Sequence, residues 1–196
     1  MKILLILMLI IFNSCSLFKP KLLNRNLSTA AKSVCLSADG RGRLTFLKRK
    51  YVFSYESYLD EAQANWLLAL SFPLHAQETF KIDWSKNDKI ELISSIEDKI
   101  LRENKNINPA MLHAFTENVG SLIKEIIDLR SKKVKTKFNW IVTNKELSAK
   151  SKDSRFEANF LNMLNSGYFG LMSLKYKVDG NSPYKLDLIV SNCLKE

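Results

Sequence analysis

Apolar and polar residues alternate with a period of two from about residue 42 to residue 84. Tyr51, Phe53 and Tyr55 fall on one face of such a segment, and "ETFKIDW" also alternates. The segment between them, "NWLLALSF", is apolar on both faces, as a central strand covered on two sides would be. Alternation of this kind is typical of strands with a buried face, and the short turns between the segments favour neighbouring strands. This part of the chain is therefore predicted to be an antiparallel meander.

The apolar spacing becomes helical over about residues 88–133, where we predict a helical insert. Asp88 is expected to cap a first helix that carries isoleucines on one side, at Ile93, Ile96 and Ile100. Asn108 and Pro109 form an N-cap followed by proline at the first helical position. A stripe spaced three and four residues apart follows: Leu112, Phe115, Val119, Leu122, Ile126 and Leu129.

Strands resume after residue 134, where Phe138, Trp140 and Val142 share one face of "KFNWIV". Segment 155–164 is ambiguous and fits either a strand or a short helix. The segments "LMSLKYKV" and "YKLDLIV" predict a closing hairpin around "DGNSP". Strands, then helices, then strands again indicate an α+β fold, in which an antiparallel sheet is covered on one side or end by the helical insert.

The N-terminus has the features of a signal peptide over residues 1–14: a lysine, then an apolar run from Ile3 to Phe12. This run is shorter than the roughly 20 residues that span a bilayer. Cys15 follows a small residue and resembles the cysteine of a bacterial lipobox, which implies cleavage before it and its modification by lipid. Ser16 at the next position suggests the outer membrane. The alternative is an ordinary signal peptide with an incidental cysteine.

Residues 15–34 are predicted to be a lipid-anchored flexible tether, and residues 35–196 to be one folded domain. The other two cysteines, Cys35 and Cys193, lie at the two ends of that domain. An exported protein can keep a disulfide, so this pair either forms a bridge or consists of two unpaired buried thiols.

Thirty basic and 20 acidic side chains give the chain a formal net charge of +10. Nucleic acid is the usual partner of a basic protein, but an exported lipoprotein rarely meets it, so we expect no nucleic-acid partner. Two interpretations stay open: the charge attracts anionic lipid headgroups, or it only keeps the surface soluble.

Catalytic and metal-binding motifs are absent from the sequence. It has no glycine-rich phosphate loop and no serine in a nucleophile elbow. The two histidines, His75 and His113, lie in different segments without metal-ligand spacing. We therefore predict no catalytic residue, metal or cofactor, and a protein that is not an enzyme.

Four segments resemble, in pattern and order, the LolB family of outer-membrane lipoproteins: "GRLTF", "KYVFSYES", "NWLLALSFPLHAQETFKID" and "LMSLKYKVDGNSPYKLDLIV". Members of that family receive other lipoproteins from a periplasmic carrier and insert them into the membrane. The resemblance implies an unclosed antiparallel β-barrel (a half-barrel) with an apolar interior and a helical lid. It also implies a monomer anchored to the outer membrane, facing the periplasm, whose partners are lipoprotein acyl chains, the carrier and membrane lipid.

The resemblance also implies site residues. The family has an exposed apolar side chain in a Pro-Leu loop that enters lipid, and the matching residues are Pro73 and Leu74; alternatively, Leu74 folds back onto its own sheet. An apolar cavity for acyl chains has nine candidate residues, each of which is otherwise simple core: Phe46, Phe53, Trp66, Leu68, Leu70, Phe80, Ile82, Trp140 and Met172. The competing hypothesis is a non-catalytic envelope lipoprotein that binds a partner protein and has a filled interior.

Overall fold

The structure, a computed structural model, describes residues 27–46, 49–73, 77–84, 91–94, 109–132, 136–143, 145–178 and 181–194. A short helix covers residues 27–32. The remaining elements are β1 (Ala38–Phe46), β2 (Arg49–Asp60), β3 (Asn65–Ser71), β4 (Glu78–Asp83), β5 (Glu91–Ser94), α4 (Pro109–Arg130), β6 (Asn139–Val142), β7 (Leu147–Lys150), β8 (Phe156–Met163), β9 (Phe169–Val178) and β10 (Asn181–Cys193).

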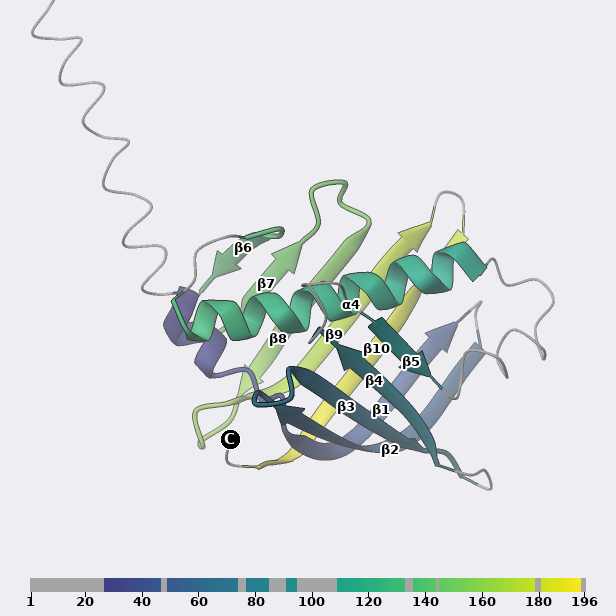
Figure 1. Cartoon of the computed structure of the whole chain (residues 1–196), viewed down its shortest axis with the longest axis horizontal. Coiled ribbons are helices and arrows are strands. Elements are labelled where there is room, and N and C mark those ends of the chain that lie inside the picture. The colour runs from purple at the N-terminus through teal and green to yellow at the C-terminus, as the bar shows by residue number, and fades with distance from the viewer. Residues whose placement is uncertain are drawn as a thin grey trace, which may run out of the picture.

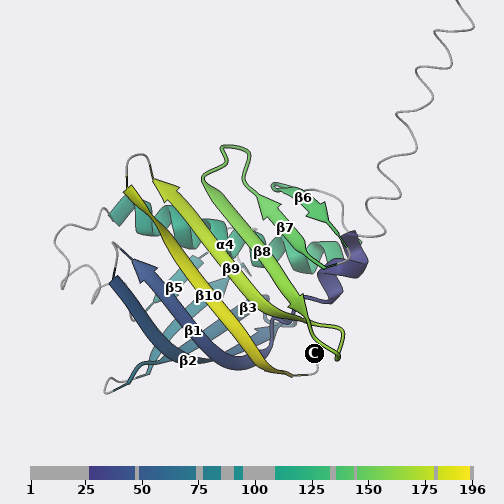
Figure 2. The same cartoon turned by 180° about the vertical axis from the view of Figure 1, so that it is seen from behind.

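The ten strands in the described part of the chain belong to one antiparallel sheet in the order β5-β4-β3-β2-β1-β10-β9-β8-β7-β6. Two meanders, β1–β5 and β6–β10, meet at a central seam where β1 pairs with β10. The sheet curls but does not close, because β5 and β6 form its two edges and do not pair with each other (Figures 1 and 2). The prediction of an α+β fold with an unclosed antiparallel sheet is confirmed at this level.

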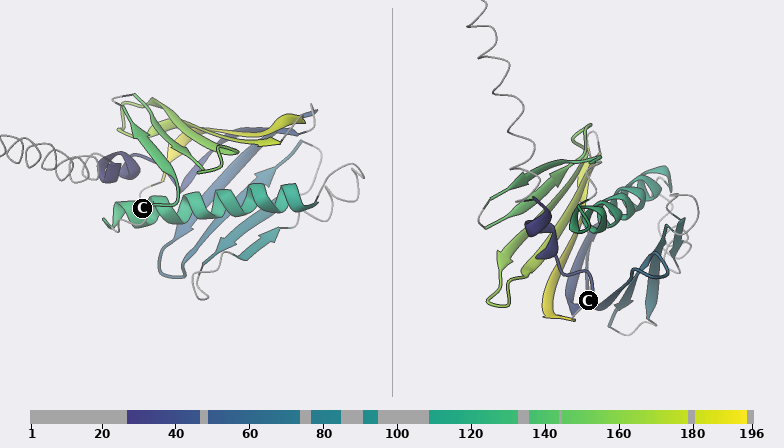
Figure 3. Two further views of the ribbon diagram at one scale, coloured as in Figure 1. Left: turned by 90° about the horizontal axis from the view of Figure 1, so that it is seen from above. Right: turned by 60° about the vertical axis from the view of Figure 1, so that its left-hand side comes forward.

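Helix α4 connects the two edges of the sheet, since the chain runs from β5 through α4 to β6. It lies across the concave side of the curled sheet (Figure 3). The predicted apolar stripe faces inward from Phe115 onward, because Phe115, Val119, Leu122, Ile126 and Leu129 are all buried. The side chain of Leu112 lies outside the described residues. The prediction of a helix beginning at Pro109 is confirmed, and this helix ends at Arg130.

The predicted first helix of the insert is wrong over its described part. Glu91–Ser94 is strand β5, which pairs with β4 and places Leu92 opposite Ile82. The isoleucine spacing is compatible with a helix. As a strand, however, the segment forms hydrogen bonds with the backbone groups of β4, and the local sequence pattern carries no information about that partner. Ile96 and Ile100 lie outside the described residues.

Segment 155–164, which the sequence left open, forms strand β8. Its burial alternates, with Phe156, Ala158 and Phe160 all at most 1% exposed. A strand places these three on one face and pairs them with β7 and β9. The apolar positions at 156, 158 and 160 have the period of a strand.

The predicted tether is wrong over its last eight residues, 27–34. Leu27, Ala31 and Val34 are 3%, 0% and 1% exposed, respectively. Leu27 and Ala31 are four residues apart and lie on one side of the short helix, and Val34 follows the end of that helix; all three pack into the core. Arg130, at the end of α4, donates hydrogen bonds to the carbonyls of Ala31 (3.3 Å) and Val34. The folded unit therefore includes residue 27, while the signal segment and Cys15 lie outside the described residues.

Cys35 and Cys193 are joined by a disulfide, with their Cα atoms 5.8 Å apart. The bridge lies at one end of the central seam, where Ala38 of β1 is opposite Cys193 of β10. The amide of Leu194 donates to the carbonyl of Ser37 beside it, at 2.8 Å. Covalent and hydrogen bonds thus hold the two meanders together at this end.

Candidate functional site

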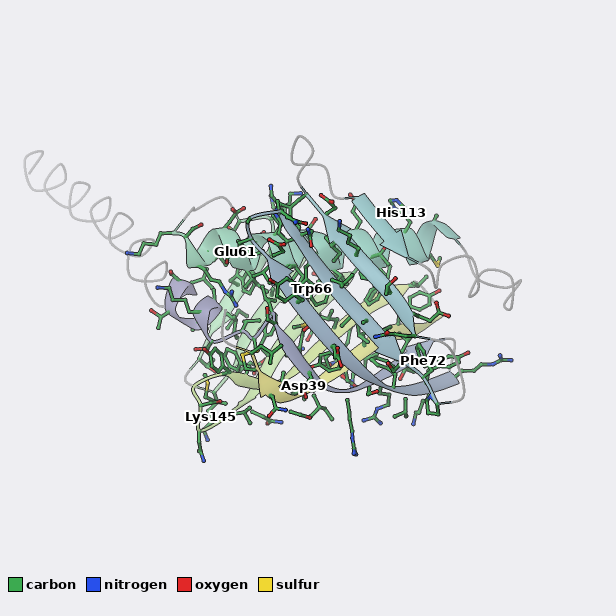
Figure 4. All side chains as sticks on the ribbon, turned by 60° about the horizontal axis from the view of Figure 1, so that its bottom comes forward. Asp39, Glu61, Trp66, Phe72, His113 and Lys145 are labelled. Carbon is green, nitrogen blue, oxygen red and sulfur yellow. A yellow bond between two sulfur atoms is a disulfide. The ribbon has the colours of Figure 1, made fainter. Side chains whose placement is uncertain are left out.

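The concave face of β3 and β4 is apolar and buried. Trp66, Leu68 and Leu70 alternate along β3, and each is at most 7% exposed, while Ile82 of β4 is fully buried. The indole nitrogen of Trp66 donates to the carbonyl of Leu36 at 2.8 Å, which fixes the ring within this apolar surface (Figure 4). A buried indole needs such a partner because an unpaired N–H is costly.

Two glycines in β1 allow large rings to lie across the middle of the sheet. A Cβ at Gly42 would lie 2.0 Å from the ring of Phe53. A Cβ at Gly40 would lie 1.9 Å from the carbonyl oxygen of Ile189 and 2.9 Å from the ring of Tyr55. Burial, and secondarily the charge of Asp39, raises the pKa of Tyr55, so its hydroxyl stays neutral. Sequence reasoning missed these glycines, although alternate glycines in "DGRGRL" are an unusual composition for a strand interior.

An aromatic cluster fills the space between α4 and the β8–β9 side of the sheet. The ring of Phe115 lies 6.3 Å from that of Phe156 and 6.5 Å from that of Tyr176. Phe138, just before β6, is 5.7 Å from Phe156. These contacts fix α4 to this half of the sheet.

Glu125 is a buried acidic residue, 4% exposed, within the apolar side of α4. Its carboxylate accepts hydrogen bonds from the amides of Lys137 (2.7 Å) and Phe138 (3.5 Å) and from the indole of Trp140 (2.6 Å). Burial raises the pKa of Glu125, and the three hydrogen bonds oppose that rise. The residue joins α4 to the start of β6. Its only sequence signal is a glutamate between Leu122 and Ile126 of the stripe.

The structure brings eight of the predicted cavity residues to the concave side. Phe80 and Trp140 are half-buried and pack against the core, while six are buried: Phe53, Trp66, Leu68, Leu70, Ile82 and Met172. Cross-strand register aligns Phe80 with Leu68. The side chain of Phe46 lies outside the described residues.

The predicted membrane loop follows β3 at the end of the sheet away from the disulfide. Pro73 is exposed, and the ring of Phe72 before it packs on Phe53 at 5.3 Å. Figure 4 shows Phe72 at this end and Glu61 at the other. Leu74 lies outside the described residues, so its role stays a prediction.

Two hollows open on the outer face of the sheet and differ from the predicted apolar cavity. One, of about 520 Å³, is lined largely by outward residues of β1–β3, among them Asp39, Glu56 and Tyr58. The other, of about 380 Å³, is lined by residues of β1, β8, β9 and β10, among them Arg43, Lys175 and Ile189. Both linings combine polar and apolar groups.

His113 is exposed on α4, and its Nδ1 lies 4.0 Å from the carboxylate of Glu117 (Figure 4). In the part of the chain that the structure describes, no group of three or more His, Cys, Asp or Glu side chains could hold a metal. None of the described helices has the length and apolar character needed to cross a bilayer.

No family model, curated protein or solved structure matches this chain. The resemblance to LolB therefore stands on the sequence segments quoted above.

Proposed function

We propose that this protein is an outer-membrane lipoprotein that binds the acyl chains of other lipoproteins and helps to insert them into the membrane. The observation that supports it is the concave apolar face of an unclosed sheet, which helix α4 crosses. Acyl chains need an enclosed apolar surface rather than placed polar groups, and each CH₂ withdrawn from water contributes about 0.8 kcal/mol. A periplasmic lipoprotein carrier is the proposed donor.

In this proposal α4 is a lid that opens at its N-terminal end. Its C-terminal part is held by Arg130, which bonds the 27–34 segment, and by Glu125, which bonds the start of β6. Near the N-terminal end, the hydroxyl of Tyr184 makes a long contact of 3.8 Å with the sulfur of Met111. Lifting that end would separate Phe115 from the aromatic cluster and would expose the end of the concave face away from the disulfide, where Phe53 lies. The part of α4 held by Glu125 and Arg130 would act as the hinge.

Delivery is assigned to the Pro73–Leu74 turn. Burying one leucine in the interface contributes at most about 1.5–3 kcal/mol, which is weak alone but sufficient to bias contact once a lipid at Cys15 holds the protein near the bilayer. The turn lies at the sheet end to which the N-terminus of α4 also points, since Met111 contacts Tyr184 at the start of β10.

A photoactivatable fatty acid tests the binding step on the full chain. Peptides from β2–β4 that carry Trp66 and Leu68 should be labelled, and an excess of unlabelled fatty acid should suppress the labelling. Labelling confined to outer-face peptides, or none at all, would refute acyl binding on the concave side.

Transfer of a lipoprotein from the protein to liposomes tests the delivery step. Leu74→Glu should bind cargo normally but release it slowly. The matched control is Met163→Glu, because Met163 is an exposed apolar residue, 45% exposed, at the disulfide end of β8 and away from the turn. Equal transfer by Leu74→Glu and wild type would remove the turn from the mechanism.

The aromatic cluster favours a second candidate, a partner-binding envelope lipoprotein with a filled interior. Phe156, Phe160 and Leu147 are each at most 1% exposed, so this half of the concave side is solidly packed. This candidate predicts no competed acyl labelling and no effect of Leu74→Glu on lipoprotein transfer. The two experiments above therefore separate the candidates.

A further inference from the structure

Lysines from four strands form a row across the outer face of the sheet. Residues directly opposite each other in antiparallel strands share a face. The registers run from Lys150 of β7 to Glu157 of β8, Lys175 of β9, Lys185 of β10, Thr45 of β1 and Lys50 of β2. We call these six residues the basic row. It follows the sheet end that also carries the turn after β3, away from the disulfide.

The basic row has a net positive charge, because it contains four lysines and one glutamate. Lys175 and Lys185 are directly opposite, an arrangement that is unfavourable without a nearby anion. Asp187 supplies one, since its carboxylate lies 2.8 Å from Lys185 Nζ and 4.0 Å from Arg43 Nε. Ser173 also donates to Asp187, at 2.7 Å, so this carboxylate is fully engaged.

Glu157 is the second acidic group. Its pKa is lowered, first by a hydrogen bond from Asn159 and then by the charges of nearby lysines, Lys175, Lys177 and Lys150. Each of the two carboxylates therefore faces several cations. Lys50 and Lys177 are exposed at the same end and extend the surplus of positive charge.

A hollow of about 380 Å³ opens beside the row, and Arg43, Lys175 and Lys185 are among its lining residues. Exposed apolar side chains lie on the same outer face, with Val52 61% and Ile189 52% exposed. Cations around a shallow hollow fit a phosphate group, and flanking apolar side chains fit the boundary beneath lipid headgroups.

We propose that the basic row docks this end of the protein on the phosphate headgroups of an anionic bilayer. The proposal goes beyond acyl binding and holds whether or not the interior admits lipid. It orients the end that carries the turn after β3 toward the membrane.

The N-terminal chain is long enough for this orientation if Cys15 is anchored. The 12 steps from residue 15 to residue 27 reach up to about 40 Å when extended, at about 3.5 Å each. The 22 residues of α4 run between the two ends of the sheet over about 33 Å. A lipid anchor and the basic row could therefore touch one bilayer together.

The test is co-sedimentation of the full chain, with Cys15→Ala to prevent lipid attachment, with two kinds of vesicle. One is pure phosphatidylcholine and the other contains phosphatidylglycerol. The row variant replaces two lysines of the row and the adjacent Lys177, as Lys50→Gln/Lys175→Gln/Lys177→Gln, and leaves the Lys185–Asp187 pair intact. The control is Lys32→Gln/Lys132→Gln/Lys145→Gln, three exposed lysines at the disulfide end with the same change in net charge.

Wild type and control should bind the anionic vesicles more tightly than the neutral ones, and added salt should weaken that binding. Each lysine near an anionic surface contributes roughly fivefold in affinity, so the row variant should lose on the order of a hundredfold. Equal losses in the two variants, or no loss in the row variant, would overturn the proposal. Unchanged thermal midpoints will show that both variants fold.

Protection of lysine amines from acylation gives a second measurement on the unmutated chain. Anionic vesicles should protect Lys50, Lys175 and Lys177 and leave Lys32, Lys132 and Lys145 reactive. Uniform protection, or protection at the disulfide end only, would also overturn the proposal.

Discussion

Removal of the Cys35–Cys193 disulfide should strongly destabilise the folded protein. The bridge joins residues 158 positions apart and so closes almost the whole folded chain. In the chain-entropy model a loop of this length stabilises the native state by about 5 kcal/mol, by restricting the unfolded chain. That is a large fraction of the roughly 5–15 kcal/mol by which domains are stable.

The position of the bridge adds a structural reason. Every other strand pairing in the sheet joins strands that are consecutive along the chain, whereas the β1–β10 seam joins its two ends. Forming the seam therefore has the largest loop-closure cost of any pairing in the sheet. The disulfide removes most of that cost because it keeps Cys35 and Cys193 together in the unfolded chain.

Urea unfolding of Cys35→Ala/Cys193→Ala, in a Cys15→Ala background that prevents thiol exchange, measures the effect. Alanine suits position 35 because that side chain is 5% exposed in apolar surroundings. We expect a loss of about 3–5 kcal/mol relative to the oxidised parent, and the parent in reductant should match the variant. A larger m-value is also expected, since an unbridged unfolded chain exposes more surface.

The reasoning is refuted if the oxidised parent and the double variant unfold with the same free energy. Agreement between the variant and the reduced parent is the necessary control, because it separates the loss of the bridge from the effect of two new alanines. Hydrogen exchange should show the same loss at every amide that exchanges through global unfolding, because the bridge acts on the unfolded chain.

Three further predictions concern the interior. Burial raises the pKa of Glu125, so the folded protein binds the proton of this carboxyl group more tightly than the unfolded chain does. The contribution of Glu125 to the free energy of unfolding therefore falls as pH rises from 4.5, its ordinary pKa, through the raised pKa of the folded state. Glu125→Gln should remove that slope in urea titrations at several pH values, and an unchanged slope would contradict the assignment. Gly42→Ala should cost about 1–3 kcal/mol, since its Cβ would overlap the ring of Phe53, and Phe53→Leu should reduce that cost in a double-mutant cycle; additive effects would count against ring overlap. Trp66→Phe should cost about 1 kcal/mol or more in urea unfolding, because the buried carbonyl of Leu36 loses its indole donor; no loss would show that this hydrogen bond is dispensable.

The sequence by itself determined the elements whose side-chain period is long and regular. Tyr51, Phe53 and Tyr55 alternate as the buried face of β2 requires, and the spacing from Phe115 to Leu129 predicts the inner side of α4. Such patterns are visible because each strand or helix buries one face of its own, which constrains residues that are close in the chain.

Tertiary structure alone decided what depends on residues distant in the chain. Residues 91–94 became a strand because β4 offered a partner edge, and residues 27–34 became part of the core because Arg130 and the sheet end bind them. The basic row exists only in the register that aligns Lys150 with residues as far away as Lys50. A local period records which face a side chain occupies, but only strand pairing decides which neighbours share that face.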